Sequence, residues 1–367
     1  IFFYDNDPDG LCSFLLLQRY IDRGRGVAIR SFPELDANYF KKVEELNADY
    51  IFILDKPIVS SGFWKEVEKV NLPVVWIDHH DVGESQNIPL WVNYFNPIFN
   101  TENRKFSVSQ TSGTQEVRDS VNKKFPVSQT SKEKQEVRDI DKKSSEPVTY
   151  LCYQITKRKE DLWIAVVGCV FDHFVPDFYL EFKKDFPDLS VDSFEPFDIF
   201  YKSQIGKIAK IFSFALKDRV TNVVNMQRFL LKVKTPYEVL EENSKNYGMH
   251  LRFDQINKKY LKLIEKAVSI EKNSSKILFF QYGGDLSISS DLANELSYKF
   301  PKKVIVVVYV TGVKANVSVR GKNVRKFILK IIEGLNGATG GGHEDAVGAQ
   351  VKIEDLEIFR ERLEKNF

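Results

Sequence analysis

The chain has 367 residues, of which 43 % are hydrophobic and 28 % are charged, and its formal net charge is +2 at pH 7. This balance is typical of an ordinary globular protein with about two domains. The small net charge excludes a global basic field, so any nucleic acid would have to bind at a local basic surface.

Cysteine usage and hydropathy exclude two further classes of protein. Cys12, Cys152 and Cys169 are isolated, with no CxxC spacing, which argues against a disulfide framework or a structural zinc site and predicts a reducing, cytoplasmic location. There is no run of about 18 apolar residues, so no membrane span is predicted. The chain does not begin with Met, and we expect that some residues precede Ile1.

The first predicted strand runs into an acidic turn. Residues 1–4 are apolar, the turn carries Asp5, Asp7 and Asp9, and residues 11–21 have a strong helix pattern. Strand, turn and helix in this order open a βαβ unit. Carboxylates this close repel one another unless a cation or a proton intervenes, which favours a metal site. The alternative is a helix-capping turn, although capping needs only one Asp.

Two further strands also deliver polar side chains at their ends. Residues 49–54 form a buried strand followed by Asp55, and residues 72–77 form another, followed by Asp78, His79 and His80. A strand at 26–31 and helices at 38–45 and 61–70 complete a β–α alternation, which predicts a parallel, doubly wound sheet. Ligands bind at the carboxyl ends of such strands, and carboxylate with imidazole suits divalent metals. The alternative is a solvated strand end.

A polar insertion interrupts this pattern. Residues 93–100 are expected to form a loop, and residues 101–145 are rich in Ser, Thr, Lys, Glu and Gln. The insertion contains a duplication: residues 105–112 recur at 124–131, and residues 115–119 recur at 135–139. Two copies are too few for a solenoid, so we expect either a protruding arm or a disordered loop.

Regular structure resumes with a helix that begins near Pro147. Residues 162–171 are continuously apolar and form either a helix or a strand, which ends in Asp172. A polar helix end would also explain this residue. As the fourth acidic site to follow an apolar run, Asp172 is better explained as a metal ligand.

A separate pattern begins near residue 273. Helices at 235–265 lead into strands at 276–282, 303–310, 316–320 and 349–353, with helices at 289–299, 323–335 and 354–365. The fold prediction is therefore α/β, with an N-terminal, mainly parallel sheet domain at 1–235, a helical linker at 236–272 and a smaller C-terminal α/β domain at 273–367.

The C-terminal domain carries a glycine-rich motif, Gly340-Gly341-Gly342-His343. Glycines let backbone N–H groups approach a ligand closely. With Arg320, which ends a predicted strand, the motif predicts a substrate site for a phosphate or a carboxylate. A flexible turn with a surface His is the alternative. Lys322, Arg325 and Lys326 are candidates for nucleic-acid backbone contacts, or else form a solvated helix face.

The acidic and imidazole groups could together hold two Mn²⁺ or Mg²⁺ ions about 3.5–4 Å apart, with Asp55 as the candidate bridging carboxylate. Such a site predicts hydrolysis of a phosphodiester or a phosphoanhydride. Asp78, His79 and His80 are the expected catalytic residues. The expected metal ligands are Asp5, Asp7, Asp9, Asp55, Asp78, His79 and Asp172.

In order along the chain, Asp5-x-Asp7-x-Asp9-Gly10, Asp55, Asp78-His79-His80 and Asp172 resemble the four motifs of the DHH phosphoesterase superfamily. Gly340-Gly341-Gly342-His343 resembles the signature of its DHH-associated C-terminal domain. The opening motif has the RecJ-like form, with Phe3 where other branches tend to have His. Outside the insertion the resemblance covers almost the whole chain, and it is strongest to the compact archaeal RecJ-like exonucleases.

The resemblance implies a single-strand-specific exonuclease that binds two Mn²⁺ or Mg²⁺ ions and releases mononucleotides from DNA or RNA. It also leaves two alternatives open. One is a nanoRNase or cyclic-dinucleotide phosphodiesterase that acts on short substrates. The other is a replication-associated scaffold with replicative helicase components as partners. The intact ligand set favours an enzyme.

Overall fold

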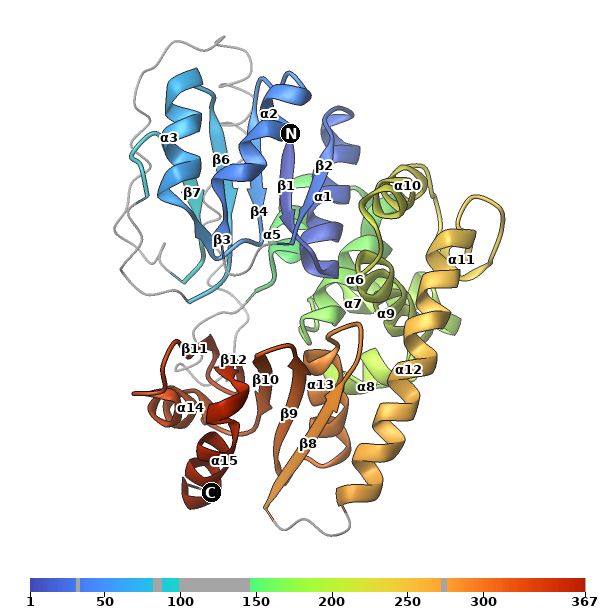
Figure 1. Cartoon of the computed structure of the whole chain (residues 1–367). Helices are drawn as coiled ribbons and strands as arrows, with labels where there is room; N and C mark the ends of the chain where they lie inside the picture. Colours follow the sequence, from blue (N-terminus) through green and yellow to red (C-terminus); the bar gives the residue numbers. More distant parts are fainter. Residues whose placement is uncertain (31–33, 82–87, 99–145, 272–275, 367) are drawn as a thin grey trace, which may run out of the picture. The chain divides into compact units, whose positions relative to one another are not determined.

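The computed structural model describes residues 1–30, 34–81, 88–98, 146–271 and 276–366 (Figure 1). These residues form two compact units, Ile1–Phe253 and Asp254–Phe367. The predicted insertion at 101–145 lies outside the described residues. Helix α12, Tyr247–Glu271, contains the division between the units.

The first unit is built on a five-stranded parallel sheet with the strand order β2-β1-β4-β6-β7. The strands are β1 Phe2–Asp5, β2 Gly26–Ile29, β4 Ile51–Leu54, β6 Val74–Ile77 and β7 Val92–Phe95. The predicted α/β class with a parallel sheet is confirmed. A small two-stranded sheet of β3, Glu34–Leu35, and β5, Ile58–Val59, lies apart from it.

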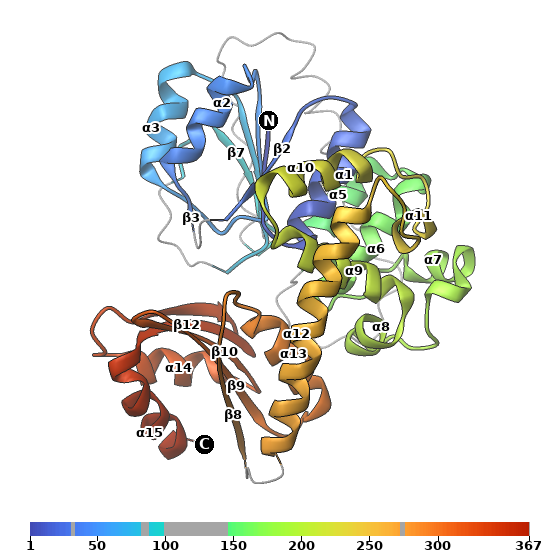
Figure 2. The ribbon, with the colours of Figure 1, turned by 45° about the vertical axis from the view of Figure 1, so that its right-hand side comes forward.

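Apolar side chains on both faces of the central strands explain why helices cover the sheet on both sides. Phe3 of β1 meets Phe63 of α3, Ser61–Val70, with ring centroids 5.6 Å apart. Its neighbour Tyr4 points the other way and stacks on Phe14 of α1, Pro8–Ile21, at 5.2 Å. Figure 2 shows α3 and α2, Lys41–Glu45, on one face and α1 on the other.

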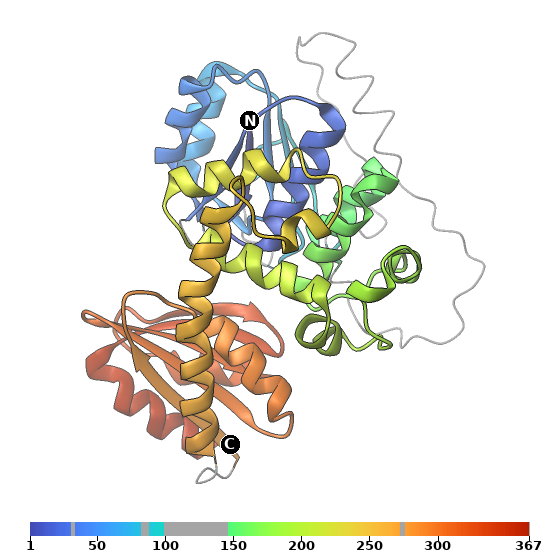
Figure 3. The same cartoon turned by 90° about the vertical axis from the view of Figure 1, so that its right-hand side faces the viewer.

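The helical part of the first unit packs around α1. Helix α1 contacts α5, Val148–Thr156, and α6, Leu162–Phe171, and α6 contacts α9, Gln204–Leu216 (Figure 3). The remaining helices among the described residues of this unit are η1 Ala37–Phe40, η2 Lys159–Asp161, α7 Tyr179–Asp185, η3 Pro187–Leu189, α8 Pro196–Lys202, α10 Val220–Leu230 and α11 Tyr237–Leu240. Because neighbours surround α6, the apolar run at 162–171 is a helix that is hydrophobic all round.

One predicted element is wrong. The stretch at 93–100, expected to be a loop, contains β7, which pairs in parallel with β6 from Val74↔Val92 to Ile77↔Phe95. Asn93 and the nearby Pro97 are residue types that strands usually avoid, and they conceal the alternation of Val92 with Tyr94. Pairing with the buried strand β6 outweighs these weak local preferences.

The second unit has a mixed five-stranded sheet with the order β11-β12-β10-β9-β8, in which β8 and β9 are parallel and the other pairs antiparallel. The strands are β8 Ile277–Gly283, β9 Val304–Thr311, β10 Lys314–Arg320, β11 Thr339–His343 and β12 Ala346–Lys352. Helices α14, Val324–Ile332, and α15, Leu356–Asn366, share one apolar core with the sheet, and η4 spans Ile353–Asp355. Helix α13, Ser289–Lys299, packs on β9 and β10.

The described helices are all too short or too polar to cross a membrane. The three cysteines are buried and form no disulfide.

Candidate metal centre

Three neighbouring strands of the parallel sheet bring three acidic turns to one edge. Strands β1, β4 and β6 lie side by side. Asp5 ends β1, Asp55 follows β4, and Asp78, His79 and His80 follow β6. Because the strands are parallel, all three turns lie at the carboxyl edge of the sheet, where open α/β sheets bind ligands.

The first turn is shaped by a helix cap and a glycine. Asp7 is the N-cap of α1, and its Oδ1 accepts a hydrogen bond from the backbone N–H of Gly10 at 2.9 Å. A Cβ atom on Gly10 would lie 2.5 Å from the carbonyl oxygen of Asp5, so only glycine fits here without a shift of the backbone. Strand β1 and helix α1 are thus joined by a tight turn, and three carboxylate side chains project from it.

Asp9 is tied to a helix far along the chain. Its Oδ2 and Oδ1 accept hydrogen bonds from the backbone N–H groups of Val148 and Thr149, at 2.9 and 2.7 Å. These are the first residues of α5, so Asp9 satisfies amides that the helix itself leaves unpaired. The Thr149 hydroxyl also donates to the Asp9 carbonyl at 2.9 Å.

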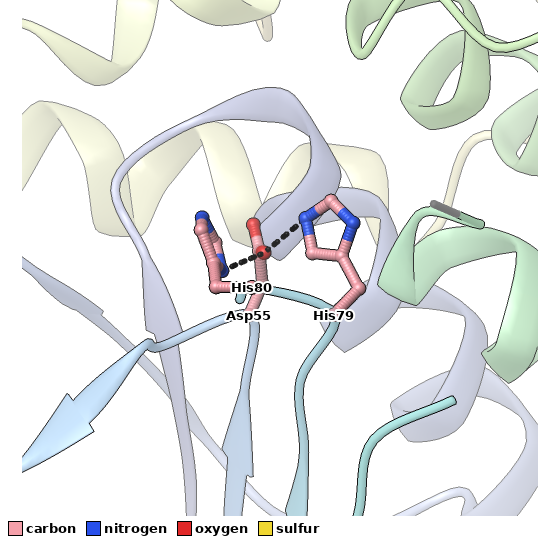
Figure 4. A group of neighbouring side chains, drawn as sticks. All are labelled: Asp55, His79 and His80. Carbon is pink, nitrogen blue, oxygen red and sulfur yellow. Dashed lines mark ion pairs between the residues drawn. The ribbon is translucent and has the colours of Figure 1, made fainter. Parts of the chain in front are cut away.

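Asp55 lies in the middle of the cluster. Its Oδ1 is 3.3 Å from His79 Nε2 and 3.8 Å from His80 Nδ1 (Figure 4). This oxygen is buried and has no hydrogen-bond donor among the residues that the structure describes. Asp55 adopts a left-handed backbone conformation with φ = 57°, which Asp and Asn tolerate better than other residues with a side chain.

The other contacts converge on His79. Its Nε2 lies 3.4 Å from Oδ2 of Asp172, the residue that caps the C-terminal end of α6. The same nitrogen lies 3.9 Å from Asp9 Oδ2. The side chains of His79 and Asp9 are almost fully buried, and that of Asp172 is 23 % exposed. A buried imidazole therefore joins carboxylates from β4, α1 and α6.

The donor atoms fall into three overlapping groups, each with its atoms within 4.8 Å of one another. Asp55 belongs to two of the groups and His79 to two. The groups are Asp5, Asp7 and Asp55; Asp55, His79 and His80; and Asp9, His79 and Asp172. Asp55 thus has the position of a carboxylate shared between two neighbouring sites.

Crowding and burial disfavour negative charge on these carboxylates. Burial, followed by the charges of Asp5 and Asp9, raises the pKa of Asp7 to about 7. Burial raises the pKa of Asp9 to about 6, although its hydrogen bonds with Thr149 and Val148 counteract the shift. Burial and the neighbouring carboxylates also raise the pKa of Asp55 and of Asp172 well above the usual range. The cluster needs protons or cations to balance its charge.

Asp78 has a different environment from the other carboxylates. It lies outside the three donor groups found among the described residues. Its Oδ1 is 2.8 Å from His80 Nδ1, and its Oδ2 accepts a hydrogen bond from the side-chain amide of Asn96 at 3.4 Å. Burial lowers the pKa of His80, but the charge and hydrogen bond of Asp78 outweigh this and raise it to about 9. Asp78 therefore orients the imidazole of His80 and favours its protonated form.

Sequence reasoning missed Asn96, Lys56 and Thr149, all of which bind the candidate ligands. Asn96 also donates to the carbonyl of His80 at 3.1 Å and to the Tyr94 hydroxyl at 3.0 Å. Lys56 is fully buried, and its Nζ lies 2.7 Å from Asp5 Oδ1. Asn96 could have been found as the polar residue after a fourth strand if β7 had been recognised. Nothing in the sequence marks Lys56, because lysine is rarely buried.

The donor chemistry fits divalent metal ions. Carboxylate oxygens predominate, and one or two imidazoles accompany them, which suits Mn²⁺ and Mg²⁺ better than soft-ligand metals. The buried Oδ1 of Asp55 without a hydrogen bond, and the raised pKa values of four carboxylates, are both expected where a cation completes the site. The residues present can therefore hold such ions.

The remaining predicted residues lie together in the second unit. Arg320 of β10 and His343 of β11 both pair with Ala346 of β12, so they flank one residue on neighbouring strands. Gly340, Gly341 and Gly342 belong to the exposed edge strand β11 and not to a turn. Arg320 Nε donates to Asn294 Oδ1 at 2.5 Å, which holds the guanidinium beside α13.

Comparison with known proteins agrees with this architecture. Residues 273–367 match the DHHA1 domain family. The whole chain superposes on RecJ from Thermus thermophilus in complex with Mn²⁺, with a TM-score of 0.62 and 14 % identity. Residues 273–367 therefore form a DHHA1 domain, and the chain as a whole has the RecJ-like fold.

Two other structures share the RecJ-like fold. Exonuclease RecJ bound to manganese matches with a TM-score of 0.57 and 13 % identity, over 100 % of this chain and 89 % of its own. CDC45 from Entamoeba histolytica matches with a TM-score of 0.50 and 10 % identity, over 99 % of this chain and 94 % of its own. The chain is covered completely by the Thermus thermophilus protein but spans only 51 % of that protein's length. No curated protein sequence matches significantly.

Proposed function

We propose that this RecJ-like protein is a metal-dependent phosphodiesterase, and specifically a single-strand exonuclease that releases mononucleotides from DNA or RNA. The observation that carries the proposal is the position of Asp55. It belongs to the donor group of Asp5 and Asp7, and its Oδ1 lies 3.3 Å from Nε2 of His79, which belongs to the donor group of Asp9 and Asp172. Two divalent ions, Mn²⁺ or Mg²⁺, are the expected cofactors.

The eight acidic and imidazole residues have different roles in the proposed reaction. Asp5, Asp7 and Asp55 would hold one ion, and Asp9, His79 and Asp172 would hold the other, with Asp55 close to both. When bound, the ions would supply Lewis acidity that activates water and stabilises charge on the phosphate. Asp9 and His79 are almost fully buried, which keeps these ligands fixed during the reaction.

His80 is suited to donate a proton. With a pKa of about 9 it is protonated at neutral pH, and Asp78 accepts the hydrogen bond from Nδ1. The proton on Nε2 can therefore be given to the oxygen that leaves the phosphorus. General acids of this kind accelerate such steps by roughly 10²–10⁴-fold.

The second unit offers groups that suit binding of the substrate's phosphates. Arg320 presents a guanidinium, and guanidinium groups bind phosphate through paired hydrogen bonds. A Cβ atom on Gly341 would meet no atom within 4 Å, so the backbone of β11 is open at this residue. We therefore propose Arg320, Gly340, Gly341, Gly342 and His343 as substrate-binding residues.

Two other functions use the same fold. A nanoRNase or cyclic-dinucleotide phosphodiesterase would share the metal centre and differ in the length of substrate it accepts. A replication scaffold is suggested by the likeness to CDC45, which at 10 % identity concerns the fold alone. Replicative helicase components would then be its partners. The complete donor set favours the enzyme.

The test is product analysis in Mn²⁺ with end-labelled single strands of about 5 and about 40 nucleotides, as DNA and as RNA, beside a cyclic dinucleotide. Stepwise degradation of the long strand is the expected result, and the labelled end gives the polarity. Asp55→Asn is the inactive control, because Asn tolerates the left-handed conformation of this residue. Asp22→Asn is its matched control, since Asp22 has φ = 59° at the exposed end of α1.

Cleavage confined to the short or cyclic substrates would replace the exonuclease with the second function. No cleavage of any substrate by protein with bound Mn²⁺ would contradict the proposal and favour the scaffold.

A further inference from the structure

Lys56 is a fully buried lysine that contacts the acidic cluster at Asp5. Its side chain is 0 % exposed, and its Nζ lies 2.7 Å from Oδ1 of Asp5, whose side chain is 22 % exposed. The backbone is held as well, because Trp76 Nε1 donates to the Lys56 carbonyl at 2.9 Å. A buried ammonium group is costly unless a partner of opposite charge accompanies it, so this contact defines where the charge lies.

The turn after β4 directs two consecutive side chains to the same cluster. In a regular strand, neighbouring residues point to opposite faces. Asp55 departs from this pattern with φ = 57°, and both its carboxylate and the Lys56 ammonium then approach Asp5. Asp5, Asp7 and Asp55 form one of the three donor groups. This group therefore already contains a positive charge, that of the Lys56 ammonium.

We propose that Lys56 is a tethered cation that lowers the affinity of the Asp5–Asp7–Asp55 position for a divalent ion. An incoming ion must share Asp5 with the ammonium group and is repelled by it at short range. The two metal positions are then unequal. The Asp9–His79–Asp172 position fills first, and the Asp5–Asp7–Asp55 position fills second and exchanges its ion readily. This inference rests on the metal centre of the proposed function.

The direction in which metal affinity changes when Lys56 is removed distinguishes this role from a structural one. A lysine that only supports Asp5 would, when removed, leave a disordered ligand and weaker metal binding. A competing cation would, when removed, leave a more negative site and tighter binding. Removing one unit charge a few ångströms from a divalent ion is expected to change affinity at least about tenfold at the effective dielectric constant of a protein interior.

The experiment is calorimetric titration of the metal-free full chain with Mn²⁺. Lys56→Met removes the charge and retains the length of the side chain, and Lys56→Gln retains a hydrogen-bond donor for Asp5. Lys56→Arg retains the charge. Lys65→Met is the matched control, because Lys65 is an exposed lysine of α3. Thermal unfolding in EDTA and in Mn²⁺ is recorded for each protein.

The wild-type protein is expected to bind one ion tightly and a second weakly. Lys56→Met and Lys56→Gln should bind the second ion at least about tenfold more tightly, and Mn²⁺ should raise their melting temperatures more than it raises that of the wild type. Lys56→Arg and Lys65→Met should behave as the wild type does.

Unchanged or weaker binding of the second ion by both uncharged variants would overturn the role of Lys56 and leave the metal centre intact. A wild-type protein that binds no Mn²⁺ would overturn the centre itself, and this inference with it.

Discussion

Asp78 Oδ1 lies 2.8 Å from His80 Nδ1, so two residues of one short motif form a hydrogen-bonded ion pair beside the acidic cluster. The pair fixes the orientation of the imidazole and leaves Nε2 as its other proton-bearing atom. Asn96 accompanies the pair by donating to Asp78 Oδ2. The side chain of Asp78 is fully buried, and that of His80 is 28 % exposed. In the proposed reaction, Asp78 would therefore act through His80.

The first prediction concerns this pair. In Asp78→Asn the charge that helps to raise the pKa of His80 to about 9 is lost, so the pKa should fall. A smaller fraction of His80 would then be protonated at pH 8, and activity at that pH should fall by up to roughly 10²-fold if His80 is the proton donor. NMR titration of the imidazole and a pH–rate profile measure the two effects. Asp22→Asn is the control, and an unchanged pKa of His80 would refute the assignment.

The second prediction concerns pH and metal. Asp7 and Asp9 titrate at about 7 and about 6 in the folded protein, above their unfolded value of 3.8. A raised folded pKa gives stability that is fully present below pH 3.8 and is lost as the pH rises through the folded pKa. The metal-free protein should therefore lose unfolding free energy between about pH 4 and pH 7, by up to about 1.4 kcal/mol per pH unit for each proton released.

Because metal binding displaces the same protons, the apparent affinity for Mn²⁺ should rise over the same pH range. Urea unfolding in EDTA at pH 5, 6, 7 and 8, repeated with Mn²⁺, measures both trends. Metal-free protein that is as stable at pH 8 as at pH 5 would contradict the crowding of the carboxylates.

The third prediction concerns Asn96, which is fully buried and donates to Asp78 Oδ2, the His80 carbonyl and the Tyr94 hydroxyl. Asn96→Ala leaves these acceptors without their donor and should lower the free energy of unfolding by about 1–3 kcal/mol. It should also reduce activity, because Asp78 and His80 lose their anchor. Asn93→Ala is the matched control, since Asn93 is an exposed residue of β7, the strand that Asn96 follows. Equal effects of the two changes would exclude this role for Asn96.

The fourth prediction concerns Arg320. Arg320→Ala should raise the KM for single strands by about tenfold or more, while Mn²⁺ binding stays unchanged, because the candidate metal ligands belong to the other unit. Lys322→Ala removes an exposed charge two residues further on and should change the KM by less than about threefold. Steady-state kinetics measures the KM of each variant, and calorimetry measures its Mn²⁺ binding. A loss of kcat at constant KM would assign Arg320 to the chemistry and not to binding.

The fifth prediction concerns Gly10. The Cβ atom of Gly10→Ala would lie 2.5 Å from the Asp5 carbonyl oxygen, so the turn must open and separate Asp5 from Asp7. We expect a lower melting temperature and weaker Mn²⁺ binding. Gly248→Ala is the control, because a Cβ there meets no atom within 4 Å and Ala suits the helix α12 better than Gly. If the two variants have the same melting temperature and bind Mn²⁺ equally well, the tight turn is not required for stability or for metal binding.

The sequence indicated which candidate ligands would lie together because they follow strands that are easy to recognise. Asp5, Asp55 and His79 each come after a short apolar run, and parallel pairing places those runs side by side. The run before Asp172 left helix and strand open, since a completely buried segment has no periodicity to read. This run is buried against other helices and forms the helix α6.

Other contacts could not be predicted because they join distant parts of the chain. The ion pair of Lys56 with Asp5 crosses from β4 to β1. The hydrogen bond of Thr149 to Asp9 spans 140 positions in the chain. Such contacts follow from packing, and a single sequence carries no mark of them.

The attachment of Asp9 to helix α5 has a practical consequence for genetics. Its carboxylate binds the first two amides of that helix, so Asp9→Ala removes a helix cap together with a candidate ligand, at a cost of about 1–2 kcal/mol to the fold. A phenotype from that allele would combine loss of activity with loss of folded protein. Asp172→Asn changes a partly exposed candidate ligand and is the cleaner choice for testing the proposed chemistry in the cell.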